Sequence, residues 1–573
     1  MKKFTILPAF LILVTTLNAQ SWDWGKAGTG DNFVGNSQFS IATDAKGDCI
    51  MAGVTNRVAA FGTFSVGYNT GNQTAFLVKS DSTGKVLWAT YPTTNVNGYN
   101  NILSIAGVAT DKQANIYIVG TFWGTYTFGN RTVSTGGLTS IFIAKYSPYG
   151  AILSVKIPTI NYHATASAIA MDNSDNLLVT GYFSDSLTFG STTLYEPYIT
   201  DDLFIFKFDS AGNTLWGQKA NTPSNSCAAE PSSICTDISG NVFITGYFKT
   251  DVFFDTAQLV SLNSWSGFLV KYSAAGNVAW AKQSYNLTYL NSAAYATAVC
   301  ADNEGSAYVT GCFFDDVKFG TTTLYSSTTY SSFLAKYDSL GNSVWAEQTN
   351  QGWQTTGLAS DANNDIFLTA TNYSFFCTCP IYNQAQITMG AYSMNVLIWA
   401  TYLSTINKFD KNGNGVCGSY LTGVGVLYPQ VTSDPAGKHI YISGYIPEGD
   451  SVYCGKDTLY YPLDQGALAA RWLDCSAEIE TGIKPIALTG NGITVYPNPS
   501  TGAFTVQMKN EDGRIKNIEV YNILGERVFA DILRPTQDDK VIDLSNQPSG
   551  VYLYRVLNED GSVMGEGKVV IER

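Results

Sequence analysis

Histidine and charge are scarce in this chain of 573 residues. The two His, His163 and His439, lie far apart in the sequence, and we interpret each as a surface or packing residue rather than as a catalytic base. Charged residues make up only 14% of the chain, the net charge is −13, and no basic run interrupts the acidic balance. Because an acidic chain repels polyanions, nucleic acid is not expected as a partner.

Motifs of common enzymes and long apolar runs are also missing. The sequence contains no Gly-x-Ser-x-Gly elbow and no His-Glu-x-x-His zinc helix. Beyond residue 20 no segment is long and apolar enough to span a bilayer, so we expect no transmembrane segment in the mature chain. Residues 1–20 are typical of a signal peptide, with Lys2 and Lys3 before the apolar run 4–17 and small Ala19 near the expected cut.

Ten Cys follow the signal, but they are scattered along the chain. An exported protein meets oxidising conditions, so some should form disulfides, although the sequence does not assign the pairs. The stretch "FDKNGNGV" (409–416) resembles part of a calcium loop, but Leu421 stands where such a loop uses Glu. We predict no metal and no cofactor.

Two motifs recur seven times each at a spacing of about 65 residues. One contains an Asp, as in "ICTDISGNVFITG" (234–246), and the other a basic residue, as in "SFLAKYDSLGNSVW" (332–345). The repeat Asp residues are Asp44, Asp111, Asp172, Asp237, Asp302, Asp361 and Asp434. The repeat basic residues are Lys79, Lys145, Lys207, Lys271, Lys336, Lys408 and Arg471. Such a period indicates a closed or stacked repeat array.

The local chemistry of both motifs predicts β-hairpins. Apolar and polar residues alternate in "NVFITG", which is the period of a strand. Asp followed three residues later by Gly is typical of a tight turn between two strands. Two hairpins per unit give four strands, and seven such units predict an all-β fold, a seven-bladed β-propeller over residues 21–475. The seventh copy lacks a Trp strand, and Trp24-Gly25 matches Trp216-Gly217, so residues 22–27 are expected to complete the last blade.

The complete unit, Gly-x-Phe … Phe-Gly-x-x-x-Leu … Phe-x-x-Lys-Tyr-Asp-x-x-Gly-Asn-x-x-Trp, resembles the β-propeller repeats known as seven-bladed (SBBP) repeats. The resemblance covers roughly residues 22–475 and is strongest in the third to fifth copies.

A different pattern follows the linker 476–492. Residues 493–573 alternate strands with Gly and Pro turns, which predicts a small Ig-like β-sandwich. This tail closely resembles the type A C-terminal sorting domain of the type IX secretion system. The residues that carry the match include Tyr496, Pro497, Asn498, Pro499, Gly502, Gly525, Gly550 and Tyr552. The resemblance implies contact with the secretion machinery, export from a Gram-negative cell, and release or attachment at its surface.

Repetition separates structural residues from candidate functional ones. A residue that recurs in every unit solves a problem that every unit has, so we interpret the repeat Asp residues as turn formers. Each repeat Lys either pairs with a carboxylate or covers apolar surface with its stem, and both alternatives stay open.

The sixth copy breaks the repeat with about a dozen extra residues in 371–402. Long insertions in propellers often bind partners, although a merely decorated loop, held through Cys377 or Cys379, is the alternative. The candidate binding residues of this insertion are Tyr373, Phe375, Phe376, Tyr382 and Trp399.

The sequence favours an exported, non-enzymatic binding or adhesion propeller. Polysaccharide or another surface protein is the expected partner, with aromatic residues of the insertion and of the axial channel mouth as contacts. Two alternatives remain: a carbohydrate-active enzyme with carboxylates on one propeller face, and a structural surface protein.

Overall fold

The computed structural model describes most of the chain and contains only β-strands as regular elements in the described part. The described residues are 22–30, 39–68, 73–94, 102–196, 201–222, 229–261, 264–286, 293–326, 330–349, 353–373, 383–389, 392–398, 402–423, 427–434, 437, 439–446, 450–454, 457–461, 465–472, 493–507, 516–522, 526–533, 539–558 and 563–572. They fall into two compact units, Met1–Cys475 and Ser476–Arg573. Within these ranges, no helix of a length and apolarity suited to crossing a membrane is found.

The first unit contains seven sheets built on the same four-strand meander, numbered here in chain order and counted over the described residues. Sheets 1 to 3 are β2 (Ser40–Thr43), β3 (Cys49–Thr55), β6 (Thr74–Ser80), β7 (Val86–Thr90); β8 (Ile102–Thr110), β9 (Ile116–Trp123), β12 (Ser140–Tyr146), β13 (Ile152–Lys156); and β15 (His163–Met171), β16 (Leu177–Ser184), β19 (Asp202–Phe208), β20 (Thr214–Lys219). Sheets 4 and 5 are β21 (Glu230–Thr236), β22 (Val242–Phe248), β25 (Ser266–Tyr272), β26 (Val278–Gln283); and β28 (Ala293–Ala301), β29 (Ala307–Phe314), β32 (Ser331–Tyr337), β33 (Ser343–Gln348). Sheets 6 and 7 are β34 (Trp353–Ser360), β35 (Ile366–Tyr373), β38 (Tyr402–Phe409), β39 (Gly415–Gly423); and β40 (Leu427–Ser433), β41 (Ile440–Ile446), β44 (Gln465–Trp472), β1 (Trp22–Gly30).

The core lies between neighbouring sheets. The two middle strands of a sheet are buried on both faces, as in β25, whose seven residues are all buried, and this explains their near-continuous apolar runs. The fourth strand, such as β26, mixes exposed and partly buried residues. One hydrophobic cluster joins Leu178 and Ile205 of sheet 3 to Val242 and Ile244 of sheet 4, so each sheet needs its neighbours for burial.

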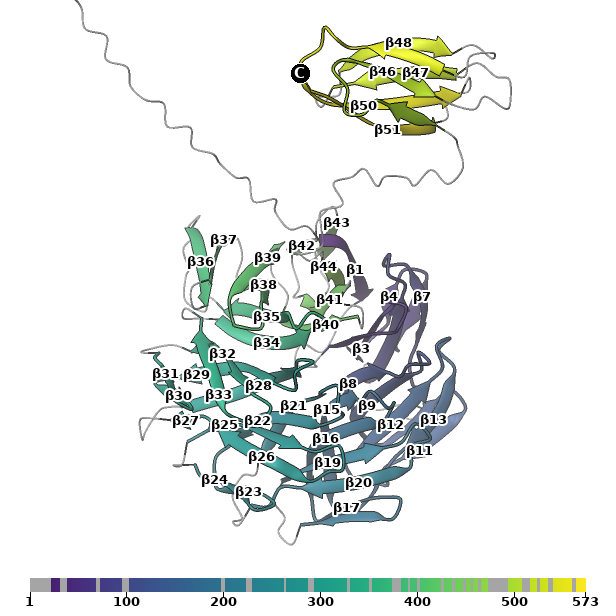
Figure 1. Ribbon diagram of the computed structural model, residues 1–573. Helices are drawn as coiled ribbons and strands as arrows, with labels where there is room; N and C mark the ends of the chain where they lie inside the picture. Colours follow the sequence, from purple (N-terminus) through teal and green to yellow (C-terminus); the bar gives the residue numbers. More distant parts are fainter. Residues whose placement is uncertain are drawn as a thin grey trace, which may run out of the picture. The chain divides into compact units, whose positions relative to one another are not determined.

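The first strand of each sheet, its inner strand, packs against the inner strands of both neighbouring sheets, as Figure 1 shows for β15, β21 and β28. Strand β2 of sheet 1 packs against β40 as well as β8. In five of the sheets, the residue before the repeat Asp carries a hydroxyl group. This hydroxyl donates a hydrogen bond to the backbone carbonyl of the equivalent residue in the preceding sheet. The bonds run from Thr110 to Thr43 (2.6 Å), Thr236 to Met171 (3.2 Å), Ser360 to Ala301 (2.8 Å), Ser433 to Ser360 (2.7 Å) and Thr43 to Ser433 (2.9 Å). The last of them joins sheet 1 to sheet 7. The result is a propeller-like arrangement of repeated sheets.

Strand β1 brings the start of the described chain to its seventh sheet. It pairs antiparallel with β44, and the register places Trp24 opposite Arg471 and Lys26 opposite Ala469. Figure 1 shows the purple β1 beside the green β44. The pairing covers an edge of β44 that is otherwise open.

Short hairpins between the second and third strands add a further link between sheets. They are β4 (Ala59–Phe61) with β5 (Phe64–Val66), β10 (Thr125–Phe128) with β11 (Arg131–Ser134), β17 (Ser186–Phe189) with β18 (Thr192–Tyr195), β23 (Val252–Phe254) with β24 (Ala257–Leu259), β30 (Val317–Phe319) with β31 (Thr322–Leu324), β36 (Asn383–Met389) with β37 (Tyr392–Ile398), and β42 (Asp450–Cys454) with β43 (Asp457–Tyr461). Each pairs with chain at the end of the preceding sheet, through β14 (Thr159–Ile160), β27 (Tyr285–Asn286), β39, β1 or an isolated bridge. The hairpin of sheet 1 pairs in this way with β1 of sheet 7, where Ala60 of β4 lies opposite Thr29 of β1.

The second unit consists of two sheets around one core. The first sheet contains β45 (Thr494–Tyr496), β46 (Ala503–Gln507) and β49 (Asp539–Asp543), and the second contains β48 (Arg527–Leu533), β47 (Lys516–Tyr521), β50 (Gly550–Asn558) and β51 (Val563–Ile571). Buried Phe504 and Ile542 of the first sheet share a hydrophobic cluster with Ile518, Val556 and Val569 of the second.

Candidate functional site

Each sheet has two ends that differ in chemistry. We call the end with the repeat Asp the turn end, and the opposite end, where the strands meet the longer connections, the loop end. In sheet 3 the register places the residues that flank the Asp172 turn, Met171 and Leu177, at the turn end, and His163 opposite Ser184 at the loop end.

At the turn end the repeat Asp closes a tight turn. The Oδ1 atom of Asp44 accepts hydrogen bonds from the backbone N–H groups of Lys46 (2.9 Å) and Asp48 (3.1 Å). Gly47 has a φ of 76°, a conformation that glycine adopts without steric cost. The same two bonds recur at Asp111, Asp172, Asp237, Asp302 and Asp361. The prediction that these residues form turns is confirmed at these positions.

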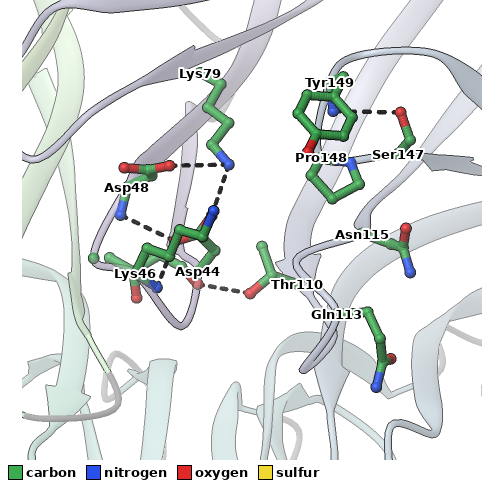
Figure 2. A network of polar contacts seen from close by, with 12 residues as sticks. Asp44, Lys46, Asp48, Lys79, Thr110, Gln113, Asn115, Ser147, Pro148 and Tyr149 are labelled. Carbon is green, nitrogen blue, oxygen red and sulfur yellow. Dashed lines mark hydrogen bonds and ion pairs between the residues drawn. The ribbon is translucent and has the colours of Figure 1, made fainter.

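The repeat Lys pairs with the turn of its own sheet. Lys79 Nζ lies 2.6 Å from Asp44 Oδ2 and 3.1 Å from Asp48 Oδ2, and Figure 2 shows the ammonium between the two carboxylates. The equivalent distances to the repeat Asp are 3.5, 2.8, 3.7 and 3.4 Å at Lys145, Lys207, Lys271 and Lys336. Burial alone would raise the pKa of Asp172, but hydrogen bonds from Lys207 and Asn176 hold that pKa below its usual value.

The first alternative for the repeat Lys, pairing with a carboxylate, is confirmed in sheets 1 to 5, and coverage of apolar surface by the Lys stem stays a prediction. The ammonium of Lys271 also lies 4.8 Å from the ring centre of Phe243, and that of Lys336 lies 4.8 Å from the ring of Tyr308. The last two sheets differ, since Lys408 pairs with Asp365 (2.8 Å) and Arg471 with Asp23 (3.4 Å).

In sheets 1, 3 and 4 a tryptophan joins the turn end to the next sheet. Trp216 Nε1 donates to the carbonyl of Ala274 in sheet 4 (3.1 Å), and the Lys207 ammonium donates to the same carbonyl (3.1 Å). A Cβ on Gly276 would lie 2.7 Å from the Trp216 ring, so only glycine fits below the indole. Trp88 and Trp280 donate to the next sheet in the same way. The turn end is therefore a repeated device for holding sheets together.

The loop end carries an aromatic cluster that does not repeat. We give this name to Tyr182, Tyr247, Trp265 and Tyr295 of sheets 3 to 5. The ring centres of Tyr247 and Tyr295 are 5.1 Å apart, those of Tyr247 and Trp265 are 5.3 Å apart, and both pairs meet edge to face. Trp265 and Tyr295 are 6.1 Å apart. All four side chains are partly exposed.

Carboxylates accompany the aromatic cluster. The Tyr247 hydroxyl donates to Glu230 Oε2 at 2.8 Å, and burial together with this carboxylate raises the pKa of Tyr247. Burial raises the pKa of Tyr295 to about 12. In sheet 3, Asp201 Oδ1 lies 2.6 Å from His163 Nε2 and accepts a hydrogen bond from the Ser184 hydroxyl (2.8 Å).

Exposed tyrosines also occur in sheets 3 to 5 and in the chain that joins or flanks their strands: Tyr162, Tyr195, Tyr285, Tyr325 and Tyr330. Each of them is more than 40% exposed. Isolated exposed aromatics are ordinary, whereas adjoining, partly exposed rings such as Tyr247, Trp265 and Tyr295 are of the kind that marks interaction surfaces.

A cavity of about 390 Å³ lies elsewhere, between sheet 1 and Ala469 of sheet 7. Apolar Met51, Phe61 and Val78 line it together with the unpaired thiol of Cys49. Burial raises the pKa of this thiol, so it stays protonated and unreactive. Among the described residues, no cluster of three metal-ligating side chains occurs.

The binding residues predicted in the sixth copy are not tested. Tyr373 ends β35, but its side chain, like Phe375, Phe376, Tyr382 and Trp399, lies outside the described residues. The described part of the insertion forms the hairpin β36–β37, a longer version of the hairpin that other sheets carry.

The expectation of aromatic contacts at the mouth of an axial channel stays a prediction, and sequence reasoning did not single out Tyr182, Tyr247, Trp265 or Tyr295. The available signal was the residue that follows the Gly near the end of each second strand, which we call the strand Gly. This residue is Tyr in "VTGYF" and "ITGYF" and small or β-branched in several other copies.

In the second unit, predicted sorting residues tie strands together. Asn498 donates through Nδ2 to the Lys568 carbonyl (2.9 Å) and accepts a hydrogen bond from the Val570 N–H (2.8 Å). The buried Tyr552 donates its hydroxyl proton to the Pro548 carbonyl (2.7 Å). Tyr496, Pro497 and Pro499 are the chain neighbours of Asn498. Gly502 has a φ of 133°, and Gly550 is the first residue of β50. Gly525 lies outside the described residues.

Comparison with known families identifies this second unit. Residues 494–572 match the family model described as a secretion system C-terminal sorting domain. The chain is therefore exported by the type IX secretion system, with which its tail interacts, to the surface or surroundings of a Gram-negative bacterium.

The first unit has more distant relatives. An uncharacterised WD repeat-containing protein of Acanthamoeba polyphaga mimivirus is 27% identical over 366 residues, which cover 52% of this chain and 26% of that protein. This chain thus spans about a quarter of that relative's length.

Solved structures overlap only loosely. One is a protein of unknown function from Dyadobacter fermentans (11% identity, 79% of this chain and 97% of that one, TM-score 0.31). Another is the extracellular domain of a putative one component system from B. thetaiotaomicron (9% identity, 96% and 99%, TM-score 0.18). Overlaps at these scores do not define a shared fold.

Proposed function

We propose that the first unit, residues 21–475, is a seven-bladed β-propeller of the SBBP type that acts as a non-enzymatic binding or adhesion module. In this proposal residues 1–20 are a signal peptide, β1 closes the last blade, residues 476–492 are a linker, and residues 493–573 form an Ig-like sorting domain. The partner is a polysaccharide or a protein of a cell surface.

The observation that carries this proposal is the non-repeated aromatic surface at the loop end of sheets 3 to 5. The adjoining, partly exposed rings of Tyr247, Trp265 and Tyr295 have no counterpart in the repeated interactions that hold the sheets together. In an exported protein such a surface favours recognition, because aromatic side chains supply large contact areas with little loss of conformational entropy.

A binding assay tests the proposal. The purified exported protein, labelled with a fluorophore, is incubated with cells of its own kind and with their isolated surface fractions. Saturable binding with no release of reducing sugar or peptide supports a binding module. If no surface fraction retains the protein above an unrelated exported protein, the proposal fails.

An enzyme on the same surface is the second candidate, because Glu230 and Asp201 accompany the aromatic cluster. A glycosidase requires two carboxyl groups that face one substrate about 5–10 Å apart. The raised pKa of Tyr247 keeps its hydroxyl protonated, which does not favour this tyrosine as a nucleophile. If the parent releases sugar and the Glu230→Gln variant does not, the protein is an enzyme rather than a binding module.

Closure of the ring has its own test. Deleting residues 22–30 removes the strand that pairs with β44 and leaves that edge open. We expect the shortened protein to aggregate or to unfold at much lower urea concentration than the parent. An unchanged unfolding midpoint would show that β1 does not close the last blade.

A further inference from the structure

The aromatic cluster is a rigid surface. Each ring of Tyr247, Trp265 and Tyr295 contacts the other two, with centres 5.1 to 6.1 Å apart, so none can rotate freely. Their backbone positions are equally fixed, since Tyr247 lies in β22 opposite Glu230 of β21, and Tyr295 lies in the neighbouring inner strand β28. A preformed apolar surface binds at a lower entropic cost than flexible side chains do.

Hydrogen-bond acceptors lie directly beside this surface. Glu230 Oε2 accepts a hydrogen bond from the Tyr247 hydroxyl, and within the described residues Oε1 of Glu230 has no partner. Asp201 Oδ1 contacts His163 Nε2 and accepts a hydrogen bond from the Ser184 hydroxyl, and the Asp201 side chain is 42% exposed. Ionised carboxylates accept hydrogen bonds only, so these groups select a ligand that is rich in donors.

The charge around the aromatic cluster also restricts the class of ligand. Glu230 and Asp201 are acidic, and the chain as a whole carries −13. The basic side chains near them are each already engaged: Lys249 lies over the Trp265 ring at 5.9 Å, and His163 contacts Asp201. A polymer with many negative charges would be repelled.

The length of the surface points to a chain. The aromatic cluster runs from Tyr182 in sheet 3, through Tyr247 and Trp265 in sheet 4, to Tyr295 in sheet 5. Face-to-face sheets pack about 10 Å apart, so three of them span on the order of 20 Å. A ligand that uses the whole surface is thus extended, and must combine apolar faces with many hydroxyl donors.

We propose that the loop end of sheets 3 to 5 binds an uncharged polysaccharide chain, whose sugar rings stack on the aromatic cluster while their hydroxyls donate to Glu230. This inference rests on the proposed binding function and narrows its partner to one chemical class. Trp265 supplies stacking area, and Glu230 determines the preference for hydroxyl donors.

Titration of the purified exported protein with soluble polysaccharides tests the proposal. Laminarin, mannan and dextran serve as uncharged probes, and polygalacturonate as the acidic counterpart. We expect saturable binding to at least one uncharged probe and at least tenfold weaker binding to polygalacturonate. Equal or tighter binding of polygalacturonate would overturn the inference.

Variants locate the site. Trp265→Ala should weaken binding of the uncharged probe at least tenfold, and Glu230→Gln, which keeps the size of the side chain, severalfold. Tyr149→Ala is the matched control, because Tyr149 is 86% exposed at the turn end of sheet 2, and it should bind like the parent. Circular dichroism and the thermal midpoint establish that each variant is folded.

Two results separate this inference from the proposed function. If the parent binds cells but no uncharged polysaccharide, or if Trp265→Ala and Glu230→Gln both bind as tightly as the parent, the inference is wrong while a binding module remains. If the parent binds neither cells nor any probe, the proposed function itself is wrong.

Discussion

The two ends of the sheets follow opposite rules. At the turn end, equivalent positions hold the same side chains, as with the ion pair of Lys79 with Asp44 and that of Lys207 with Asp172. At the loop end, the residue after the strand Gly, or after Ala370 in sheet 6, changes from sheet to sheet: Val54, Thr121, Tyr182, Tyr247, Cys312, Thr371 and Tyr445. Packing between similar units requires the same side chains at equivalent positions, whereas binding one ligand requires side chains that differ from those of the other units.

The strongest test of this contrast removes a repeated ion pair. Lys207 and Asp172 are nearly inaccessible and 2.8 Å apart, so Lys207→Ala leaves a buried carboxylate without its cation. We expect a loss of about 3–5 kcal/mol in stability, measured as a lower midpoint of urea unfolding. Lys411→Ala is the control, since its ion pair with Glu304 is exposed to solvent, and it should change the midpoint little. Equal midpoints for both variants would contradict a structural role of the turn end.

A glycine under a tryptophan gives the next largest effect. Gly276→Ala places a Cβ 2.7 Å from the Trp216 ring at a φ of 89°. Strain and overpacking together should cost about 3 kcal/mol. Gly136→Ala has a similar φ of 64° but open space around it, and should cost about 1–2 kcal/mol. Thermal unfolding of the two variants separates the clash from the backbone strain, and equal losses would show that the indole yields without cost.

A buried carboxyl group at the loop end makes stability depend on pH. Burial and the neighbouring Glu196 raise the pKa of Asp202 to about 7, against about 3.9 in an unfolded chain. The folded state then binds the extra proton, so this contribution is fully present below about pH 4 and is lost as the pH rises through about 7. One unit of such a shift corresponds to about 1.4 kcal/mol.

Asp202→Asn removes that titration. The parent should lose more thermal stability between pH 5 and pH 8 than the variant does. The same pH dependence in both proteins would place the titrating group elsewhere.

The smallest effect comes from completing the repeat of hydroxyl bonds. Ala301 precedes the repeat Asp of sheet 5 and has no hydroxyl to donate to the carbonyl of Thr236, as Thr236 donates to Met171. Ala301→Ser should add about 0.5–1.5 kcal/mol of stability. Ser360→Ala removes the existing 2.8 Å bond to the Ala301 carbonyl and should cost a similar amount. A urea midpoint that falls in Ala301→Ser would show that the gap is not a missing bond.

Repetition also explains what the sequence could predict. The turns at Asp44 and its equivalents, the strands around them and the sorting tail follow from local rules on turn residues and alternation. The partner of each repeat Lys stayed open, because Lys207 reaches Asp172 across two strand pairings that bring together residues far apart in the sequence.

The loop end was less accessible for the same reason. Tyr247, Trp265 and Tyr295 come from three separate segments, and no local pattern indicates that their rings meet. The candidate site of the sixth copy rested on the length of the insertion, its aromatic residues and the replacement of the repeat Gly by Ala370. It stays a prediction, because its side chains lie outside the described residues.

Hydroxyl-radical footprinting compares both ends of the sheets in one measurement. The exported protein is oxidised with and without the surface fraction that binds it, and modification is quantified at each aromatic side chain. We predict that Trp265, Tyr295 and Tyr330 become protected while Tyr149 at the turn end is modified as before. Protection of Tyr149 with no change at Trp265 would show that the partner binds the repeated end.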